Sequence, residues 1–338
     1  MSPTDWRPGL AASPALFPLS LDPATDRVRL VRLSPVDYEK ASFLDERVQA
    51  PTAAEAPFGE VAEALSGAPL ACDWIFHTGH VGSTLLSRLL GAHPRVFSLR
   101  EPQALRTLAA AEVARAPWTD AELDRRLAVL QQLFSRTWAQ PKRALVKATS
   151  LVTGLAPRLL AQGGEARALL MTVSPERYLA SIFSGANLGD VRQAAPLRLS
   201  RLEARLGEAR WRLEALSPGE LAAMSWASDV AVFADLARRA PGRTRLIDFD
   251  EFLADPRAGL AAALAHLHGR ADLAEAARLA ASPYLQRYSK APEYGYGPDL
   301  RRQVLDQARR QAGDEIARGL AWLESVAAVV PALADIAP

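Results

Sequence analysis

The sequence predicts an α/β protein built on a central parallel sheet, and two observations lead to this fold class. Short apolar runs recur through the middle of the chain, and each is long enough for a buried strand. Segments with helical spacing of their apolar residues separate these runs, and strands that alternate with helices form parallel sheets. We expect the strands at Cys72–Phe76, Ala144–Val146, Ala168–Val173 and Arg245–Phe249. We expect the main helices at Gly82–Leu90, Gln103–Ala116, Asp120–Gln140, Pro175–Ser184, Pro196–Leu216, Glu220–Arg239, Ala258–His268 and Leu300–Val329.

The alternation of apolar strand patterns with helical patterns begins near residue 70, and we expect a domain boundary there. Residues 1–70 are predicted to form an N-terminal extension that packs on a core domain of residues 71–338. In the extension we expect an irregular leader over 1–26, a strand at Val28–Leu33, a helix at Pro35–Val48 and a loose stretch at Ala50–Pro57.

Composition excludes several classes of protein. The 338 residues are 49% apolar and 23% charged, as in an ordinary globular protein, and the net charge of +2 predicts no binding to nucleic acid or to an acidic membrane. We find no apolar run of about 18 residues that would span a bilayer. Prolines interrupt the first 21 residues, which argues against a signal peptide, and the single cysteine, Cys72, excludes a disulfide framework. We therefore expect a cytoplasmic protein, whose oligomeric state the sequence leaves open.

The segment most indicative of function is WIFHTGHVGSTLLSRLL, which spans Trp74–Leu90. A buried strand leads into a turn with two glycines, Gly79 and Gly82, and then into a helix that opens with the hydroxyls of Ser83 and Thr84. Unpaired N–H groups and the positive end of the helix dipole meet at such a junction, where they favour an anion. The segment predicts a phosphate-binding loop; the alternative is a glycine turn without a ligand.

The loop is not a Walker A motif, because that pattern requires lysine after the second glycine and this chain has Ser83 after Gly82. Kinase or ATPase chemistry is therefore disfavoured. The segment instead resembles the 5′-phosphosulfate loop of the P-loop sulfotransferases, which use 3′-phosphoadenosine-5′-phosphosulfate (PAPS). Bacterial members often show G-x-x-R-S-G-[ST]-T-L-L between a strand and a helix, and His80 stands here where the family usually has Arg or Lys.

The resemblance extends from about Cys72 to Tyr294 and implies a three-layer α/β/α fold with extra helices. It also implies that PAPS is the cosubstrate and that the loop binds it. The residues implied in cofactor binding are His77, Thr78, Gly79, His80, Val81, Gly82, Ser83 and Thr84.

A second matching segment is LLMTVSPERYLAS, where the family places an Arg and a Ser that hold the 3′-phosphate. Pro175 and Ser181 have the family spacing, whereas Val173 occupies the position of the arginine. Arg177 lies one helical turn before Ser181 and is a candidate for the missing cation. The alternative is a well-capped helix, opened by Ser174, that carries a surface arginine.

A third matching segment, RTRLIDFDEFLADP, spans Arg243–Pro256. Its acids Asp248 and Asp250 resemble a Walker B strand end that would bind magnesium. The sulfotransferase resemblance instead implies structural acids that cap the next helix and pair with a nearby arginine. A weaker match is YSKAPEY, at Tyr288–Tyr294.

For the reaction itself we predict three catalytic residues. Glu101, in SLREPQAL, matches a glutamate that some family members use as the base, and Lys147 matches a lysine near the transferred sulfuryl group. His80 would help to stabilise the leaving phosphate. Glu101 has an alternative role, in which it pairs with Arg100 or caps the following helix.

We expect no metal, because the sequence has no cluster of cysteine and histidine. The first hypothesis is a PAPS-dependent sulfotransferase that acts on a hydroxyl or amine of a small-molecule acceptor. The alternatives are a kinase-like P-loop phosphotransferase and a non-catalytic descendant that binds a nucleotide or a protein partner. We also expect Gly82→Val to abolish ligand binding by blocking the approach of the backbone.

Overall fold

The computed structural model describes residues 5–138, 142–287, 295 and 297–327. The chain divides into two compact units. Unit 1 comprises residues 1–75 and 86–168, and unit 2 comprises residues 76–85 and 169–338. The predicted N-terminal extension therefore lies wholly within unit 1.

Five strands form the central parallel sheet, in the order β5-β6-β4-β7-β8. Helices flank this sheet in a three-layer α/β/α arrangement, which confirms the predicted fold class. The strands are β4 (Cys72–His77), β5 (Val96–Arg100), β6 (Arg143–Lys147), β7 (Ala168–Thr172) and β8 (Thr244–Asp248). Strands β4, β5 and β7 are buried along their whole length, as expected for a sheet covered on both faces.

The sequence analysis missed strand β5, because its run VFSLR contains two polar residues. The structure buries both of them and gives them partners: the Ser98 hydroxyl lies 2.8 Å from that of Ser87, and Arg100 donates to backbone carbonyls. Polar side chains that are satisfied inside the fold do not interrupt a strand.

The N-terminal part of unit 1 contains a second sheet, which is antiparallel and has the order β1-β2-β3. Strand β2 (Arg27–Arg32) confirms the predicted strand, whereas β1 (Leu16–Asp22) and β3 (Thr52–Pro57) show that an irregular leader and a loose stretch were wrong there. Pro18 is tolerated in β1 because that strand lies at the edge of the sheet and is irregular next to the proline.

The predicted helix at Pro35–Val48 is wrong beyond Lys40, where helix α2 (Pro35–Lys40) ends. Arg88 and Arg100 donate to the last carbonyls of this helix, so the chain turns away after them. These two arginines lie far from α2 in the sequence, and for this reason the local pattern did not show the end of the helix.

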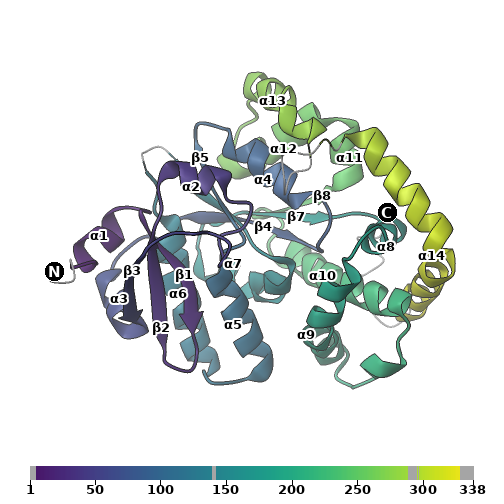
Figure 1. The fold of residues 1–338 in the computed structure, drawn as a ribbon, viewed down its shortest axis with the longest axis horizontal. Helices are drawn as coiled ribbons and strands as arrows, with labels where there is room; N and C mark the ends of the chain where they lie inside the picture. The colour runs from purple at the N-terminus through teal and green to yellow at the C-terminus, as the bar shows by residue number, and fades with distance from the viewer. Residues whose placement is uncertain (1–4, 139–141, 288–294, 296, 328–338) are drawn as a thin grey trace. The chain divides into compact units, whose positions relative to one another are not determined.

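Two long helices of unit 1 begin where the sequence predicts, at Gln103 and Asp120, but end earlier than predicted, at Ala114 and Ser135, and α1 lies within the stretch predicted to be an irregular leader. Helix α6 opens with the capping box of Thr119 and Glu122, and it ends before Arg136, whose guanidinium donates to the carbonyls of Leu133 and Leu10. Helix α5 packs against β1 (Figure 1). The helices are α1 (Arg7–Ala12), α3 (Phe58–Ala64), α5 (Gln103–Ala114), α6 (Asp120–Ser135), the 3₁₀ turn Ser150–Leu155 and α7 (Ala156–Gln162). Helix α4 (Ser83–Gly91) begins in unit 2 and continues into unit 1.

Unit 2 is organised around α10, which contacts α8, α9 and α14 (Figure 1). The predicted helix Pro196–Leu216 is wrong at both ends: α9 begins at Leu188 and stops before Gly207, whose φ of 73° closes it. The helices are α8 (Pro175–Phe183), α9 (Leu188–Leu206), α10 (Pro218–Arg239), α11 (Phe249–Ala254), α12 (Pro256–His268), α13 (Leu273–Ala280) and α14 (Pro298–Ala327).

Two further sequence expectations concern membrane-spanning helices and the single cysteine. Within the described ranges, none of the helices has the length and apolar character needed to cross a bilayer. The Cys72 thiol is buried, and burial raises its pKa to about 12, so it is an inert core group as expected. The segment Tyr288–Tyr294 lies outside the described residues.

Candidate functional site

The phosphate loop connects β4 to α4 through an unusual backbone. Three of its residues have positive φ: Gly79 at 89°, His80 at 54° and Gly82 at 69°. For His80, which has a side chain, this left-handed conformation costs on the order of 1–3 kcal/mol, and such strain gathers at functional sites. Alternation of positive and negative φ, as around Gly82, is typical of backbone turns whose successive N–H groups bind an anion.

Hydrogen bonds from within unit 2 hold the first half of the loop. The N–H of Thr78 donates to the carbonyl of Met171 at 3.2 Å, and the N–H of Gly79 donates to Nδ1 of His77 at 3.0 Å. The Ser181 hydroxyl donates to the carbonyl of His80 at 3.3 Å. The amides of Thr78 and Gly79 are thus used by the protein itself.

The second half of the loop presents donors to its surroundings. Within the described part of the chain, the N–H groups of Val81 and Gly82 and the hydroxyls of Ser83 and Thr84 have no hydrogen-bonding partner. The Thr78 hydroxyl is buried and also has none there. Buried donors without a partner are costly. This donor set, at the N-terminus of a nine-residue helix, therefore fits the oxyanions of a phosphate or sulfate group.

Gly82 is required by packing as well as by its φ. A Cβ at this position would lie 1.9 Å from Cζ of Phe249, so the aromatic ring rests directly against the glycine. The Gly82→Val expectation therefore had the wrong cause: a side chain there meets Phe249 before it meets any ligand. Sequence reasoning assigned Phe249 to a strand, whereas it opens α11 and lies under the guanidinium of Arg301 at 5.2 Å.

The two acids of the third motif are structural, which confirms the interpretation implied by the resemblance. Asp248 accepts hydrogen bonds from the N–H groups of Asp250 and Glu251 at 2.7 and 3.0 Å and so caps α11. Asp250 pairs with Arg177 at 3.2 Å and with Arg301 at 2.6 Å. Both carboxylates have partners in the protein, so neither suggests a magnesium ligand.

The second motif is held within unit 2 in a similar way. Ser174 is the N-cap of α8 as predicted, although its side chain makes no capping hydrogen bond. Val173, at the position of the family arginine, is buried, and its carbonyl accepts a hydrogen bond from Nε1 of Trp226 at 3.1 Å. Arg177 thus forms an ion pair and Ser181 contacts the loop, while the position of the family arginine belongs to the core.

His80 has an acidic neighbour that the sequence did not reveal. Its Nε2 lies 4.0 Å from Oδ2 of Asp190, in the first turn of α9. The loop therefore has a carboxylate at the limit of ion-pair distance from its imidazole.

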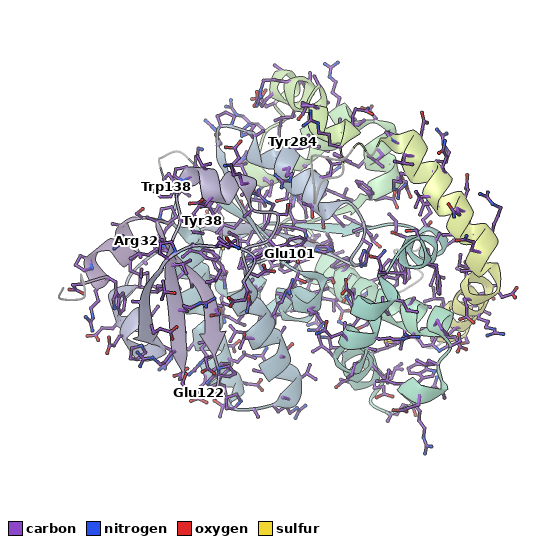
Figure 2. The ribbon with its side chains drawn as sticks, in the orientation of Figure 1. Arg32, Tyr38, Glu101, Glu122, Trp138 and Tyr284 are labelled. Carbon is purple, nitrogen blue, oxygen red and sulfur yellow. The ribbon has the colours of Figure 1, made fainter. Side chains whose placement is uncertain are left out.

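A second set of predicted residues meets in unit 1, at the carboxyl ends of β5 and β6. Glu101, which is labelled in Figure 2, follows β5 with a left-handed φ of 50°. Its N–H donates to the carbonyl of Lys147 at 2.7 Å. Oε1 of Glu101 pairs with Nζ of Lys147, and Oε2 pairs with Arg106 at 3.1 Å. We call Glu101, Lys147 and Arg106 the carboxylate cluster.

The carboxylate cluster is buried, with the Lys147 side chain 1% exposed and that of Glu101 8% exposed. Two cations thus contact the one carboxylate of Glu101. Arg100, the alternative partner, donates to the carbonyls of Ala41, Tyr38 and Glu39. Helix α5 begins only at Gln103, and Glu101 does not occupy its N-cap.

The structure therefore brings the predicted residues together in two groups. In unit 2, His80 and the loop meet Ser181, and Arg177 lies on the same helix. In unit 1, Glu101 meets Lys147. Across the residues described, no three His, Cys, Asp or Glu side chains gather as ligands for a metal ion.

No family model and no curated protein sequence matches the chain. Among solved structures, the chain resembles sulfotransferases at 14 to 19% identity, where a likeness concerns the fold alone.

Three of these structures are as follows. The sulfotransferase domain from the curacin biosynthetic pathway has a TM-score of 0.41 and 14% identity, and the match covers 73% of this chain and 97% of that one. The sulfotransferase from Alicyclobacillus acidocaldarius has a TM-score of 0.40 and 19% identity, with 75% and 95% covered. The sulfotransferase domain of the Synechococcus PCC 7002 olefin synthase has a TM-score of 0.42 and 15% identity, with 77% and 95% covered.

Proposed function

We propose that the protein is a PAPS-dependent sulfotransferase that acts on a hydroxyl or amine of a small acceptor. The observation that carries this proposal is the backbone of the phosphate loop, where three positive φ angles precede α4 and leave partnerless donors beside it. A strained loop that presents donors at a helix N-terminus is suited to a phosphosulfate group.

Each loop residue has a distinct part in this proposal. The N–H groups of Val81 and Gly82 and the hydroxyls of Ser83 and Thr84 would bind the 5′-phosphate and stabilise the charge that develops on it. His80, protonated beside Asp190, would add a positive charge to the same phosphate. Because sulfuryl transfer needs no metal, these donors are the main source of electrostatic stabilisation.

The 3′-phosphate is assigned to Arg177 and Ser181, and both would have to change partners to bind it. The Arg177–Asp250 pair is 3.2 Å long and partly exposed, and such pairs contribute about 0–1 kcal/mol, so exchange for a phosphate costs little. The Ser181 hydroxyl would give up its hydrogen bond to the carbonyl of His80.

In the transfer step, PAPS supplies the sulfuryl group: the bond from sulfur to the phosphate oxygen breaks while a bond to the acceptor oxygen or nitrogen forms. Glu101 is assigned as the base that takes the proton from the acceptor. Lys147 would hold the Glu101 carboxylate in place and contribute positive charge to the transferred group.

A thermal shift assay with 3′,5′-adenosine bisphosphate (PAP) tests the proposal. We expect PAP to raise the melting temperature without magnesium, and ATP to have little effect with or without it. Stabilisation only by Mg-ATP would support the kinase-like alternative, and no response to either ligand would support a non-catalytic descendant.

Thr84→Val locates the site, since it removes one hydroxyl at almost constant volume. A hydrogen bond to a charged group contributes about 1.5–3 kcal/mol, so PAP should bind at least tenfold more weakly. Thr25→Val, at an exposed turn of unit 1, is the matched control and should leave PAP binding unchanged. Equal affinity of Thr84→Val and wild type would place the phosphate elsewhere.

A further inference from the structure

The segment Ala41–Arg47, which follows α2, lies along the turn that carries Glu101. The N–H of Leu44 donates to the carbonyl of Arg100 at 2.8 Å, and the carbonyl of Leu44 accepts from the N–H of Gln103 at 3.1 Å. These two hydrogen bonds bracket Glu101 and Pro102 from either side. Leu44 is fully buried, so the segment Ala41–Arg47 has a fixed position beside the carboxylate cluster.

Two buried arginines fix the position of the first residues of this segment. Arg100 donates to the carbonyls of Ala41 and Glu39 at 2.7 and 3.0 Å, and Arg88 donates to the hydroxyl of Ser42 at 2.8 Å. Cations at the carbonyl end of a helix are favourable, and here they fix the direction in which the chain leaves α2. The position of the following residues is therefore set by the fold.

One of these residues is Arg47, whose guanidinium interacts with the charge of Glu101 in the carboxylate cluster. Arg47 forms a bidentate ion pair with Asp45, and it stacks on the ring of Phe43 at 3.6 Å. The hydrogen bonds that Arg47 donates to Asp45 raise the pKa of the guanidinium, and the charge of Glu101 raises it further. Burial opposes the effect at Asp45, but its hydrogen bonds to Arg47 lower the pKa of the carboxyl, and Arg106 adds to this.

The interacting side chains are therefore those of Arg47, Asp45, Glu101, Arg106 and Lys147. Three cations, Arg47, Arg106 and Lys147, face two carboxylates, Asp45 and Glu101, which leaves one net positive charge. Lys147 is buried, whereas the side chains of Arg106 and Arg47 are 36% and 59% exposed. The exposed part of Arg106 is the part of its guanidinium that an acceptor could reach, since its Nε is buried.

We infer that Arg47 and Arg106 recognise an oxyanion on the acceptor, so that the acceptor class is an anionic molecule that carries its hydroxyl or amine near a carboxylate or a similar group. This inference rests on the proposed function, because it takes Glu101 as the base. A guanidinium fork binds an oxyanion through paired N–H groups, and the excess positive charge offsets the charge of the bound acceptor. The ring of Phe43 gives the site an apolar side.

Binding of benzoate and benzamide to the full chain tests this inference, because the two probes share size and ring but differ in charge. Saturation-transfer NMR is measured with millimolar probe on protein saturated with PAP, which keeps the phosphate loop occupied. We expect binding of benzoate at least tenfold tighter than that of benzamide. Arg47→Gln should reduce this preference by at least threefold and leave PAP binding unchanged.

Arg302→Gln is the matched control, since Arg302 is an exposed arginine paired with a nearby aspartate, as Arg47 is. It should leave the preference for benzoate intact. Equal binding of the two probes to wild type, an unchanged preference in Arg47→Gln, or an equal loss in Arg302→Gln would each overturn the inference. If PAP does not bind, the proposed function fails, and the same probes added without PAP still test the oxyanion site.

Discussion

The phosphate loop and the carboxylate cluster share a backbone feature and differ in what maintains it. Each contains one non-glycine residue in the left-handed region, His80 with a φ of 54° and Glu101 with a φ of 50°. The loop is held by neutral groups: the His77 ring, the Ser181 hydroxyl and the Phe249 ring packed on a glycine. The carboxylate cluster is held by buried ion pairs.

This difference separates two ways of preparing a site. A loop held by neutral contacts keeps its N–H groups available for a charged ligand. In the carboxylate cluster Glu101 is already paired with Lys147 and Arg106, so the protein can keep this carboxylate away from water. The comparison predicts that the carboxylate cluster is sensitive to the loss of a charge, and that the loop is sensitive to added volume.

Removal of Lys147 should have the largest effect. Lys147→Met removes the cation that is buried beside the Glu101 carboxylate, and breaking a buried pair costs about 3–5 kcal/mol. Urea denaturation measures the loss of unfolding free energy. Arg302→Gln breaks an exposed pair and should be indistinguishable from wild type. Comparable stabilities for the two variants would contradict the view that the ion pair holds the carboxylate cluster together.

A methyl group added to the loop should have the next largest effect. Gly82→Ala combines a left-handed alanine with a clash against Phe249, for a cost of about 2–5 kcal/mol. Gly67→Ala is the matched control: Gly67 has a similar φ of 79° but open space around it, so only the backbone cost of about 1–2 kcal/mol applies. If both variants lose the same free energy in thermal unfolding, the packing of Phe249 does not constrain the loop.

A change of charge at His80 should have the smallest effect and should act on binding. His80→Arg supplies a permanent cation, and we expect PAP to bind up to about tenfold more tightly, with an affinity that no longer falls between pH 6 and 8. Isothermal titration calorimetry across that range measures both effects. His268→Arg adds the same charge at the end of α12, where PAP affinity should not change; an equal gain there would indicate a non-specific effect of net charge.

Much of the site could be predicted from the sequence, because its signals are local. The glycines, hydroxyls and flanking apolar runs of residues 74–90 lie in one short segment, and the acids of the third motif cap a helix that starts beside them. The contacts that were missed join residues far apart in the chain. Arg88 and Arg100 end α2, Phe249 packs on Gly82, and no local pattern reports either contact.

The same reason explains the errors in the N-terminal part. Strand β1 contains a proline and forms only through pairing with β2, so composition suggested an irregular leader. Strand β5 contains Ser98, whose partner Ser87 lies on α4, and Arg100, which donates to the carbonyl of Ala41 at the end of α2. Strand propensity is a property of the single residue, whereas β1 and β5 depend on contacts that their residues make in the folded protein.

Amide hydrogen exchange with and without PAP tests the central claim most directly, because it reports on the backbone N–H groups of the loop. We expect PAP to slow exchange in the peptides that cover residues 76–90, with the Val81 and Gly82 amides among those protected. Unchanged exchange in these peptides at a saturating concentration of PAP, or protection confined to other parts of the chain, would contradict the account.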